Sequence, residues 1–349
     1  MARIGYDLIR PVLRTLDVSG AGRMLAPLFR GEGAVFTFHH VRPARSSGFQ
    51  PNRLLEITPE FLDDVIKLVV SMGYDLVSLD TAVKRLSEGG RRFVAFTLDD
   101  GYRDNRDFAA PIFRRHGCPY TLFVTTEFLD GVGKLWWLGL EESIRRLEAV
   151  DFPEGGFSKP LPTGTDAEKQ AAYATIYRHL RQVNNAALFA IVHRLCIDAG
   201  FKLEDLCAPL CLSWEELEAF ADDPLLTLGA HTVSHPFLAK LTEVEAIREM
   251  AECKDRLEAR FRRSVTAIAY PVGDETAAGP REFEAAKALG FQIGATTRPG
   301  LLFRDHARHP MCLPRVSLNG EFQETGFVRE LLNGFPFALA NRFRRLNVH

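Results

Sequence analysis

The chain has 349 residues, of which 46% are hydrophobic and 25% are charged, so it is long enough for one large α/β barrel or two ordinary domains. The formal net charge is −2, and this near balance gives no argument for a nucleic-acid partner. No uncharged apolar run reaches the length of about 18 residues that a membrane-spanning helix needs.

The first 33 residues predict a helical segment ahead of the main fold. Asp7 and Arg10 are among the charged residues that interrupt its apolar positions, so the segment does not resemble a cleaved signal peptide. We expect it to pack on the protein's own body, and contact with a membrane surface is the alternative.

Short runs rich in β-branched and aromatic residues predict buried strands further along the chain. These runs are residues 34–41, 75–79, 93–98, 120–126, 225–230, 265–271, 291–297 and 312–318. Helical patterns lie between them. Residues 58–73 begin with the N-cap Thr58, and residues 241–261 begin with Thr242 and Glu245 at the spacing of a capping box. This alternation favours parallel strands joined by helices, and we expect the sheet to close into a barrel.

Residues 134–224 interrupt the alternation because they contain helical patterns and no convincing strand. We interpret them as a helical insertion on one barrel connection. The barrel itself is expected over residues 34–320, including the insertion, with a C-terminal helical tail over residues 321–349. The tail is basic and amphipathic, and we expect it to serve packing or dimerisation, with membrane contact as the alternative. The pattern predicts no particular oligomeric state.

The chain has six cysteines, and none of them forms a C-x-x-C pair. Cys207 and Cys211 are four residues apart, but they have no matching second pair for a structural zinc site. The spacing therefore predicts small buried thiols in a reducing cytoplasm.

Two carboxylates, Asp99 and Asp100, directly follow a predicted strand, and like charges this close oppose each other's ionisation. His231 and His235 follow another predicted strand and are spaced to share a metal ion. Because carboxyl ends of parallel strands gather at one face, we expect these groups to meet there. Two imidazoles and one carboxylate would then hold a zinc-like ion, and the second carboxylate would act as a base. When each motif is considered alone, a metal site is not the only interpretation. Asp99 and Asp100 could belong to an ordinary Asp-Asp-Gly turn, and His231 and His235 could be two incidental histidines.

The segments "TLDDG" (97–101) and "HTVSH" (231–235) resemble the first two motifs of the polysaccharide deacetylases, the NodB-homology group of carbohydrate esterases. The family patterns are T-F-D-D-G and H-[ST]-x-x-H. The resemblance extends from about residue 34 to 318, interrupted by the insertion, and it implies an α/β fold, a distorted (β/α) barrel.

Carried over by position, the resemblance implies that Asp99 is the catalytic base. It also implies that Asp100, His231 and His235 bind one divalent metal ion, with zinc as the first candidate. Pro236 disfavours helical geometry at His235, so we expect the two histidines on a loop or a last helical turn.

The third family motif, R-x-P-Y-G, corresponds to "AYPVG", which has Ala269 at the arginine position and Val272 at the tyrosine position. The backbone N–H of Val272, next to Pro271, can still donate to an oxyanion, because a backbone donor does not depend on the side chain. The missing arginine normally orients the base in this family. We expect Arg315, on a later strand, to replace it, and a surface salt bridge is the alternative.

The family's late L-x-x-H-D motif, which usually supplies the general acid, is absent. Some branches of the family resemble circular permutants and carry this histidine on an early strand, in the pattern Y-H-x-V. The segment "FHHV" (38–41) is similar to that pattern. This resemblance implies that His39 is the general acid and that His40 points the other way, because strand side chains alternate. A buried structural histidine is the alternative for His39, and His309 is the reserve candidate. Trp136 opens the insertion, and it either stacks on a sugar ring or packs in the insertion.

The resemblance therefore implies a metal-dependent hydrolase that removes N-acetyl groups from an amino-sugar-containing saccharide. The expected setting is polysaccharide or glycan biosynthesis in the cytoplasm, with possible peripheral contact to the inner membrane and no nucleic-acid partner. Two alternatives stay open: a non-catalytic carbohydrate-binding relative, and a mononuclear iron oxygenase, which also uses two histidines and a carboxylate.

Overall fold

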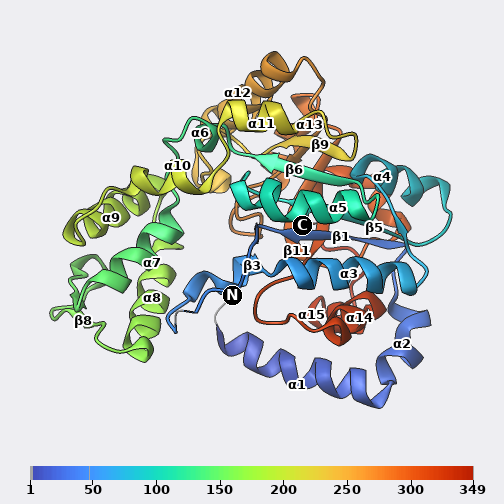
Figure 1. Cartoon of the computed structure of the whole chain (residues 1–349), viewed down its shortest axis with the longest axis horizontal. Coiled ribbons are helices and arrows are strands. Elements are labelled where there is room, and N and C mark those ends of the chain that lie inside the picture. Colours follow the sequence, from blue (N-terminus) through green and yellow to red (C-terminus); the bar gives the residue numbers. More distant parts are fainter. Residues whose placement is uncertain (1–2, 47, 349) are drawn as a thin grey trace.

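The computed structural model describes residues 3–46 and 48–348, and a parallel β-barrel forms its centre (Figure 1). Seven strands follow one another around the barrel in the order β1-β12-β11-β10-β9-β6-β5, and β1 pairs with β5 to close the ring. These strands are β1 (Gly33–Phe38), β5 (Phe93–Leu98), β6 (Tyr120–Val124), β9 (Leu226–Ala230), β10 (Ala267–Ala269), β11 (Ile293–Pro299) and β12 (Leu313–Ser317). All pairings in the ring are parallel, which confirms the predicted β/α barrel.

The remaining predicted strands lie outside the ring. β4 (Asp75–Leu76) pairs with the beginning of β5. The second half of the first predicted run becomes β2 (His40–Val41), which pairs with β3 (Glu56–Ile57) in a separate two-stranded sheet. The chain therefore turns away from the barrel directly after β1, at His39.

Alternate side chains of the ring strands fill the barrel interior. One buried cluster collects the inward positions, and its ring members are Val35, Phe93, Ala95, Phe123, Ala267, Ala269, Ile293, Ala295 and Leu313. Two residues beyond an inward position, the next side chain points inward again. Continuing the alternation past the ends of β1, β5 and β9 therefore carries His39, Asp99 and His231 to the inside of one mouth.

Helices cover the outside of the barrel and pack on a second, larger apolar cluster. They include α3 (Pro59–Ser71), α5 (Ala110–Arg115), α12 (Glu243–Phe261) and α13 (Pro280–Ala288). Helix α4 (Leu79–Glu88) instead packs on the cluster that fills the barrel, through Leu79, Ala82 and Leu86. The predicted caps are confirmed: the Thr58 hydroxyl accepts the Phe61 N–H, and Thr242 and Glu245 form a capping box.

The connection from β6 to β9 begins with α6 (Thr126–Leu129) and then contains the helices of the predicted insertion. They are α7 (Trp136–Arg146), α8 (Asp166–Leu180), α9 (Asn185–Asp198), α10 (Cys207–Leu210) and α11 (Trp214–Phe220). Helices α7 to α9 extend from the barrel as a lobe, drawn in green in Figure 1, with an apolar core of its own. Helix α11 returns to the barrel, where Leu217 and Phe220 join the outer cluster. The expectation that the insertion holds no strand is wrong, because β7 (Ala149–Val150) and β8 (Leu161–Pro162) form a short antiparallel pair.

The helices formed by the first and last parts of the chain lie beside one another along the lower side of the view in Figure 1. The first residues form α1 (Arg3–Ser19) and α2 (Ala21–Phe29), and the last form α14 (Thr325–Asn333) and α15 (Phe335–Ala340). An ion pair between Asp17 and Arg329, at 2.9 Å, joins α1 to α14. None of the helices in the described part of the chain combines the length and apolarity needed to cross a bilayer.

Single helical turns complete the structure. The 3₁₀ turns are Pro51–Leu55, Pro153–Gly155, Leu203–Leu206, Leu238–Lys240, Arg304–Arg308 and Pro310–Cys312, and a π-helical turn spans Asn105–Ala109. The six cysteines are buried free thiols, as predicted.

Candidate active site

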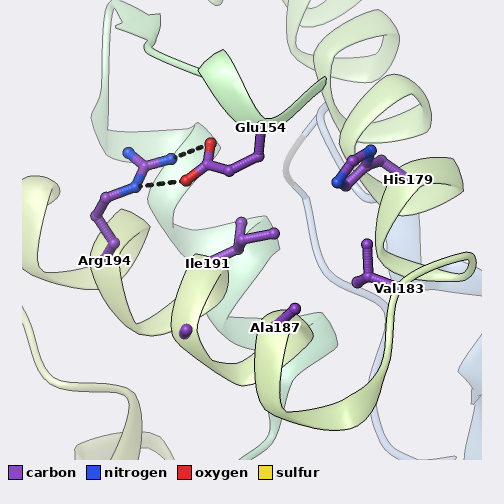
Figure 2. A pocket seen from close by; sticks show the side chains of 7 residues that line it. Glu154, His179, Val183, Ala187, Ile191 and Arg194 are labelled. Atoms are coloured by element: carbon purple, nitrogen blue, oxygen red, sulfur yellow. Dashed lines mark hydrogen bonds and ion pairs between the residues drawn. The ribbon is translucent and has the colours of Figure 1, made fainter. Parts of the chain in front are cut away.

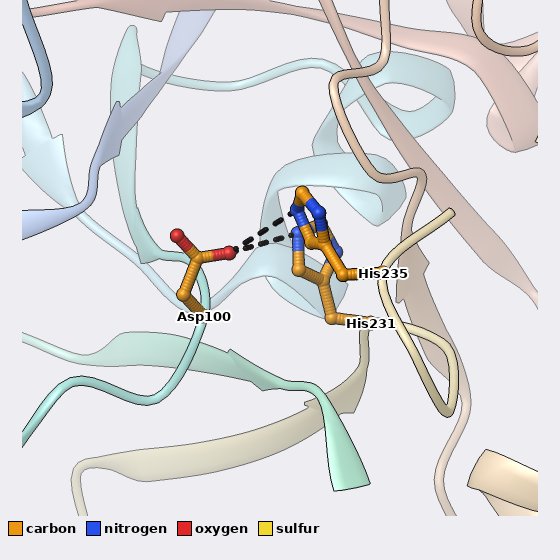
Figure 3. Close-up of side chains that lie close together, drawn as sticks. All are labelled: Asp100, His231 and His235. Carbon is orange, nitrogen blue, oxygen red and sulfur yellow. Dashed lines mark ion pairs between the residues drawn. The ribbon is translucent and has the colours of Figure 1, made fainter. Parts of the chain in front are cut away.

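A carboxylate and two imidazoles converge at the carboxyl ends of β5 and β9 (Figure 3). One oxygen of Asp100, Oδ1, lies 3.4 Å from Nε2 of His231 and 3.4 Å from Nε2 of His235. All three side chains are buried, and their ligand atoms lie within 4.8 Å of one another. The structure thus brings together the three residues that were predicted to share a metal ion.

The hydrogen bonds of this group suit a divalent cation. Nδ1 of His231 lies 2.7 Å from the carbonyl oxygen of Ala269, which can only accept, so Nδ1 carries the proton and Nε2 offers its lone pair. Oδ1 of Asp100 is buried without a hydrogen-bond partner, and a buried carboxylate needs a partner of opposite charge. The donor set, two imidazole nitrogens and one carboxylate oxygen, fits zinc or a similar ion.

The pKa directions agree with this assignment. Burial lowers the pKa of His235 to about 4, which keeps its ring neutral at pH 7. Burial alone would raise the pKa of Asp100, but the surrounding imidazoles outweigh it and hold this pKa well below its usual value. Burial likewise opposes protonation of His231, yet Asp100 and Asp99 raise its pKa. The two carboxylates therefore favour a positive charge between Nε2 of His231 and Asp100.

Strained backbone marks the loops of this site. Seven non-glycine residues have positive φ among the described residues. Four of them lie at or beside the metal group, namely Asp100 (75°), Thr232 (66°), His235 (58°) and Val272 (61°). Such a conformation costs about 1–3 kcal/mol, and it is most unfavourable for a β-branched side chain. Strain concentrated on these loops is typical of a functional site.

The loop that carries both histidines is held by side chains around it. Within the loop, the Thr232 hydroxyl accepts the His235 N–H at 3.1 Å. From α12, the Glu249 carboxylate accepts the backbone N–H groups of Val233 and Ser234, both at 2.9 Å, and the Ser234 hydroxyl at 2.7 Å. The predicted loop conformation at His235 is confirmed. The sequence did not point to Glu249, which is one of many glutamates on a charged helix.

The neighbouring carboxylate, Asp99, has a separate partner. Arg315 of β12 binds it through two parallel hydrogen bonds, Nη1 to Oδ1 at 2.8 Å and Nη2 to Oδ2 at 2.7 Å. The same guanidinium donates from Nε to the carbonyl of Thr296 and from Nη1 to the hydroxyl of Thr97. Its side chain is 0% exposed, so the alternative of a surface salt bridge does not hold.

This ion pair determines the charge of Asp99. Burial alone would raise the pKa of Asp99, but the Arg315 guanidinium holds it below its usual value. The two adjacent carboxylates therefore have different partners: Asp99 binds an arginine, and Asp100 faces two imidazoles.

The two adjacent histidines after β1 point to different surroundings. Nε2 of His39 lies 3.9 Å from Oδ2 of Asp99, and this side chain is 19% exposed, so it lies at the mouth of the site. Burial lowers the pKa of His39 in spite of the nearby carboxylates. His40 turns outward, with Nδ1 2.6 Å from Asp104 and its ring stacked on Tyr102. The Asn105 side chain donates to the His39 carbonyl at 2.7 Å and fixes this turn.

The segment of the third motif directly follows β10, and the Ala269 carbonyl ties it to His231. Pro271 and Val272 lie two and three residues beyond this contact. The Val272 carbonyl accepts the Thr297 hydroxyl at 2.6 Å, which holds the strained turn against β11. Val272 packs at the fringe of the insertion's core.

Two sequence expectations need correction. Trp136 is only 3% exposed and packs against Tyr177 and Phe237, so the structure places it in the core of the insertion and not on an open sugar-binding surface. Its neighbour Trp137 lies nearer the site, with its ring 5.0 Å from that of His235. The reserve acid, His309, precedes β12 and therefore lies towards the amino ends of the strands, away from the site.

A hollow of about 590 Å³ lies elsewhere, on the insertion (Figure 2). Helices α8 and α9 form much of its lining, and Arg194 and Glu154 pair across one side of it. Its lining contains none of the predicted site residues.

Comparison with known proteins agrees with the fold and with the family resemblance. Residues 163–294 match the family model described as polysaccharide deacetylase, a stretch that includes His231 and His235 but not Asp99 and Asp100. The curated relative YxkH of Bacillus subtilis, which is named for the same family, is 33% identical over 109 residues. That alignment covers 30% of this chain and 37% of the relative, so this chain spans little more than a third of its length.

Solved structures show the same fold at low sequence identity. The Streptococcus pyogenes deacetylase PplD, solved in complex with acetate, is 16% identical with a TM-score of 0.55, covering 85% of this chain and 97% of that one. IcaB from Ammonifex degensii is 16% identical with a TM-score of 0.54, covering 86% of this chain and 97% of that one. The matched stretch and the relative are thus similar to polysaccharide deacetylases, and the two solved structures share the fold of this chain.

Proposed function

We propose that this protein is a metal-dependent hydrolase that removes N-acetyl groups from an amino-sugar-containing saccharide. One observation carries the proposal: the buried group of Asp100, His231 and His235 lies beside an ionised carboxylate, Asp99, that a buried arginine holds in place. This combination offers a cation site and a base side by side. The family match supports deacetylation as the reaction.

Asp100, His231 and His235 would hold the metal ion, and zinc is the ion that this donor set favours. When bound, such an ion lowers the pKa of a water molecule and polarises a carbonyl group. The neutral ring of His235 and the accessible lone pair on Nε2 of His231 prepare both imidazoles for this role.

The chain's own residues would move the protons. Asp99 accepts a proton from the attacking water, because Arg315 keeps its carboxylate ionised and correctly oriented. His39 lies at the exposed side of the site with Nε2 3.9 Å from Asp99, so it receives the proton that Asp99 takes from the water and passes it to the amine nitrogen as the C–N bond breaks. The backbone N–H of Val272 stabilises the oxyanion that forms on the amide carbonyl. The products are acetate and a free amino sugar.

The setting of the reaction follows from the same chemistry. Six buried free thiols support a reducing compartment, the cytoplasm. The substrate we propose there is an N-acetylated intermediate of polysaccharide or glycan biosynthesis, and not a finished wall polymer.

The test is acetate release from short N-acetylglucosamine oligomers by the zinc-loaded protein. The wild type should release acetate, and Asp99→Asn should lower kcat by about 10²–10⁴-fold because the amide cannot accept the proton. Asp107→Asn is the matched control: this carboxylate is 41% exposed and lies outside the site, so activity should be unchanged. Bound zinc without acetate release from these oligomers would exclude them as substrates and leave a different amide substrate or a non-catalytic binder. Full activity of Asp99→Asn would remove Asp99 from the role of base.

A further inference from the structure

The helices from the two ends of the chain share an unusual charge composition. Residues 1–30 and 325–349 together contain nine arginines and only three acidic residues, whereas the whole chain has slightly more acidic than basic residues. Of the acidic side chains, Asp17 is paired with Arg329, and Glu330 is fully buried. The positive charge at this edge of the molecule therefore remains largely uncompensated.

Six of these arginines are exposed in the described part of the chain. Arg10 donates to the Glu321 carbonyl and Arg345 lies over the Phe303 ring. The other four are Arg14 on α1, Arg23 on α2, and Arg342 and Arg344 after α15. Within the part of the chain that the structure describes, none of the four forms an ion pair. Elsewhere on the surface, exposed arginines such as Arg91 and Arg115 do pair with carboxylates. These four guanidinium groups are thus available to an external anionic partner.

Large apolar side chains are exposed among the same arginines. Val18 and Met24 are each 81% exposed, Leu28 is 63% exposed and Phe343 is 62% exposed. Met24 and Leu28 are four residues apart and share one side of α2, and the Phe343 ring lies 6.1 Å from that of Phe29. We define these four apolar residues and the four arginines above as the terminal face.

Figure 1 shows α1 and α2 along one edge of the molecule with α14 and α15 next to them on the inner side, while α12 lies at the opposite edge. The helices of this edge hold one another through contacts between α1, α2, α14 and α15. The terminal face is therefore carried by a packed group of helices.

We propose that the terminal face docks on the surface of a bilayer that contains anionic lipids. Arginines beside exposed apolar side chains suit this surface, because the guanidinium groups bind lipid phosphates while the apolar side chains enter the boundary of the acyl chains. A second copy of the chain fits less well, since a symmetric contact would bring four unpaired arginines against four others. A nucleic acid would satisfy the arginines but would leave the apolar side chains in water.

Docking here would hold the protein at the membrane without a spanning helix. It does not depend on the catalytic residues, because none of Asp99, Asp100, His39, His231 or His235 belongs to the terminal face. Vesicle binding is therefore measured independently of acetate release.

The experiment is co-sedimentation of the full chain with vesicles. One set contains phosphatidylcholine alone, and the other contains roughly one third phosphatidylglycerol, each at about 0.1 M and about 0.5 M salt. We expect binding to the anionic vesicles at the lower salt, much weaker binding at the higher salt, and little binding to phosphatidylcholine.

Two variants separate the contributions. Arg14→Gln, Arg23→Gln, Arg342→Gln and Arg344→Gln together should weaken the partition onto anionic vesicles by about tenfold or more, through lost charge. Met24→Ser, Leu28→Ser and Phe343→Ser together should weaken it by a similar factor, through lost apolar burial. All seven side chains are exposed, so circular dichroism should show both proteins folded.

The matched control is Val244→Ser with Arg248→Gln on α12. Val244 is 77% exposed and Arg248 is exposed, so the pair removes the same chemistry from the opposite edge and should bind as the wild type does. Failure of the wild type to bind anionic vesicles would overturn the proposal, as would equal loss in the control. A lipid-free dimer that the apolar variant dissociates would also overturn it and assign the face to a second copy.

Discussion

At the scale of single residues, the site depends on two adjacent aspartates that have different partners. Asp100 faces His231 and His235 with an oxygen that lacks any other hydrogen-bond partner. Asp99 is bound on both oxygens by Arg315. A bidentate arginine fixes the plane of a carboxylate as well as its charge, which a lysine cannot do. We propose that this guanidinium, which comes from another strand, takes the place of the family arginine missing at Ala269.

We predict that Arg315→Lys lowers kcat by about 10²-fold with little change in KM, because a point charge leaves Asp99 poorly oriented. Arg315→Gln should lower kcat further than Arg315→Lys does, because Asp99 then remains buried without a cation. Zinc affinity, measured by competition with a chromogenic chelator, should change little in Arg315→Lys, since Arg315 contacts no ligand residue directly. Arg304→Lys is the control, with a side chain that is 71% exposed. A wild-type kcat in Arg315→Lys would show that the orientation of Asp99 does not limit the reaction.

At the scale of secondary-structure elements, loops in strained conformations are held by helices outside the barrel. The histidine loop has positive φ at Thr232 and His235, and Glu249 of α12 binds the two backbone N–H groups between them. The geometry of the two proposed metal ligands on this loop therefore depends on Glu249, which binds the loop backbone between them. A helix that covers the barrel also serves as a support for the loop.

We predict that Glu249→Ala weakens zinc binding by about 10–100-fold, because two backbone donors lose their acceptor and the strained loop relaxes. Glu249→Gln should retain most of the affinity, since its amide oxygen can still accept from both N–H groups. The measurement is the same chelator competition. Glu252→Ala, exposed on the same helix, should bind zinc as the wild type does. Equal affinities for Glu249→Ala and Glu252→Ala would contradict a supporting role for this contact.

Much of the fold was predictable from local sequence, and the reasons are visible in particular segments. The ring strands are short apolar runs, and Thr58 and Thr242 cap helices through atoms only three residues away. Arg315 and Asp99 are 216 positions apart in the sequence, so no local sequence pattern predicts their contact. In the sequence, Glu249 cannot be distinguished from the other glutamates of its helix, so its contact with the histidine loop was not predictable. Trp136 and Trp137 are adjacent, and only the packing of α7 decides which ring approaches His235.

At the scale of the whole molecule, ion pairs join the insertion to the barrel. Glu216, on α11, binds Arg103 through both oxygens and also binds Arg106, in the segment that follows the Asp-Asp pair. Arg103 is the largest cause that lowers the pKa of Glu216, to about 2 from the ordinary value of 4.5. A carboxyl group with a depressed pKa stabilises the fold above its unfolded pKa, and this contribution is lost as the pH falls.

We predict that Glu216→Gln lowers the free energy of unfolding by about 1–2 kcal/mol at pH 7, a figure reduced for the partial solvent exposure of the pair. The difference from the wild type should shrink as the pH falls through 4.5 towards 2, because the wild-type carboxylate then becomes protonated. Urea unfolding at several pH values measures it. Glu218→Gln, more exposed on the same helix, is the control. If the difference in the free energy of unfolding between Glu216→Gln and the wild type stayed constant across this pH range, the charge of Glu216 would not contribute to stability.

The closure of the ring between its first and last strands has a consequence for how the protein is made. β1 pairs with β5 along its whole length, but its other edge pairs with β12, which is the last strand to leave the ribosome. A nascent chain that ends before residue 313 therefore has an open barrel with an unpaired edge on β1. It also contains Asp99 without its arginine, so synthesis of β12 both closes the sheet and neutralises a carboxylate that would otherwise resist burial.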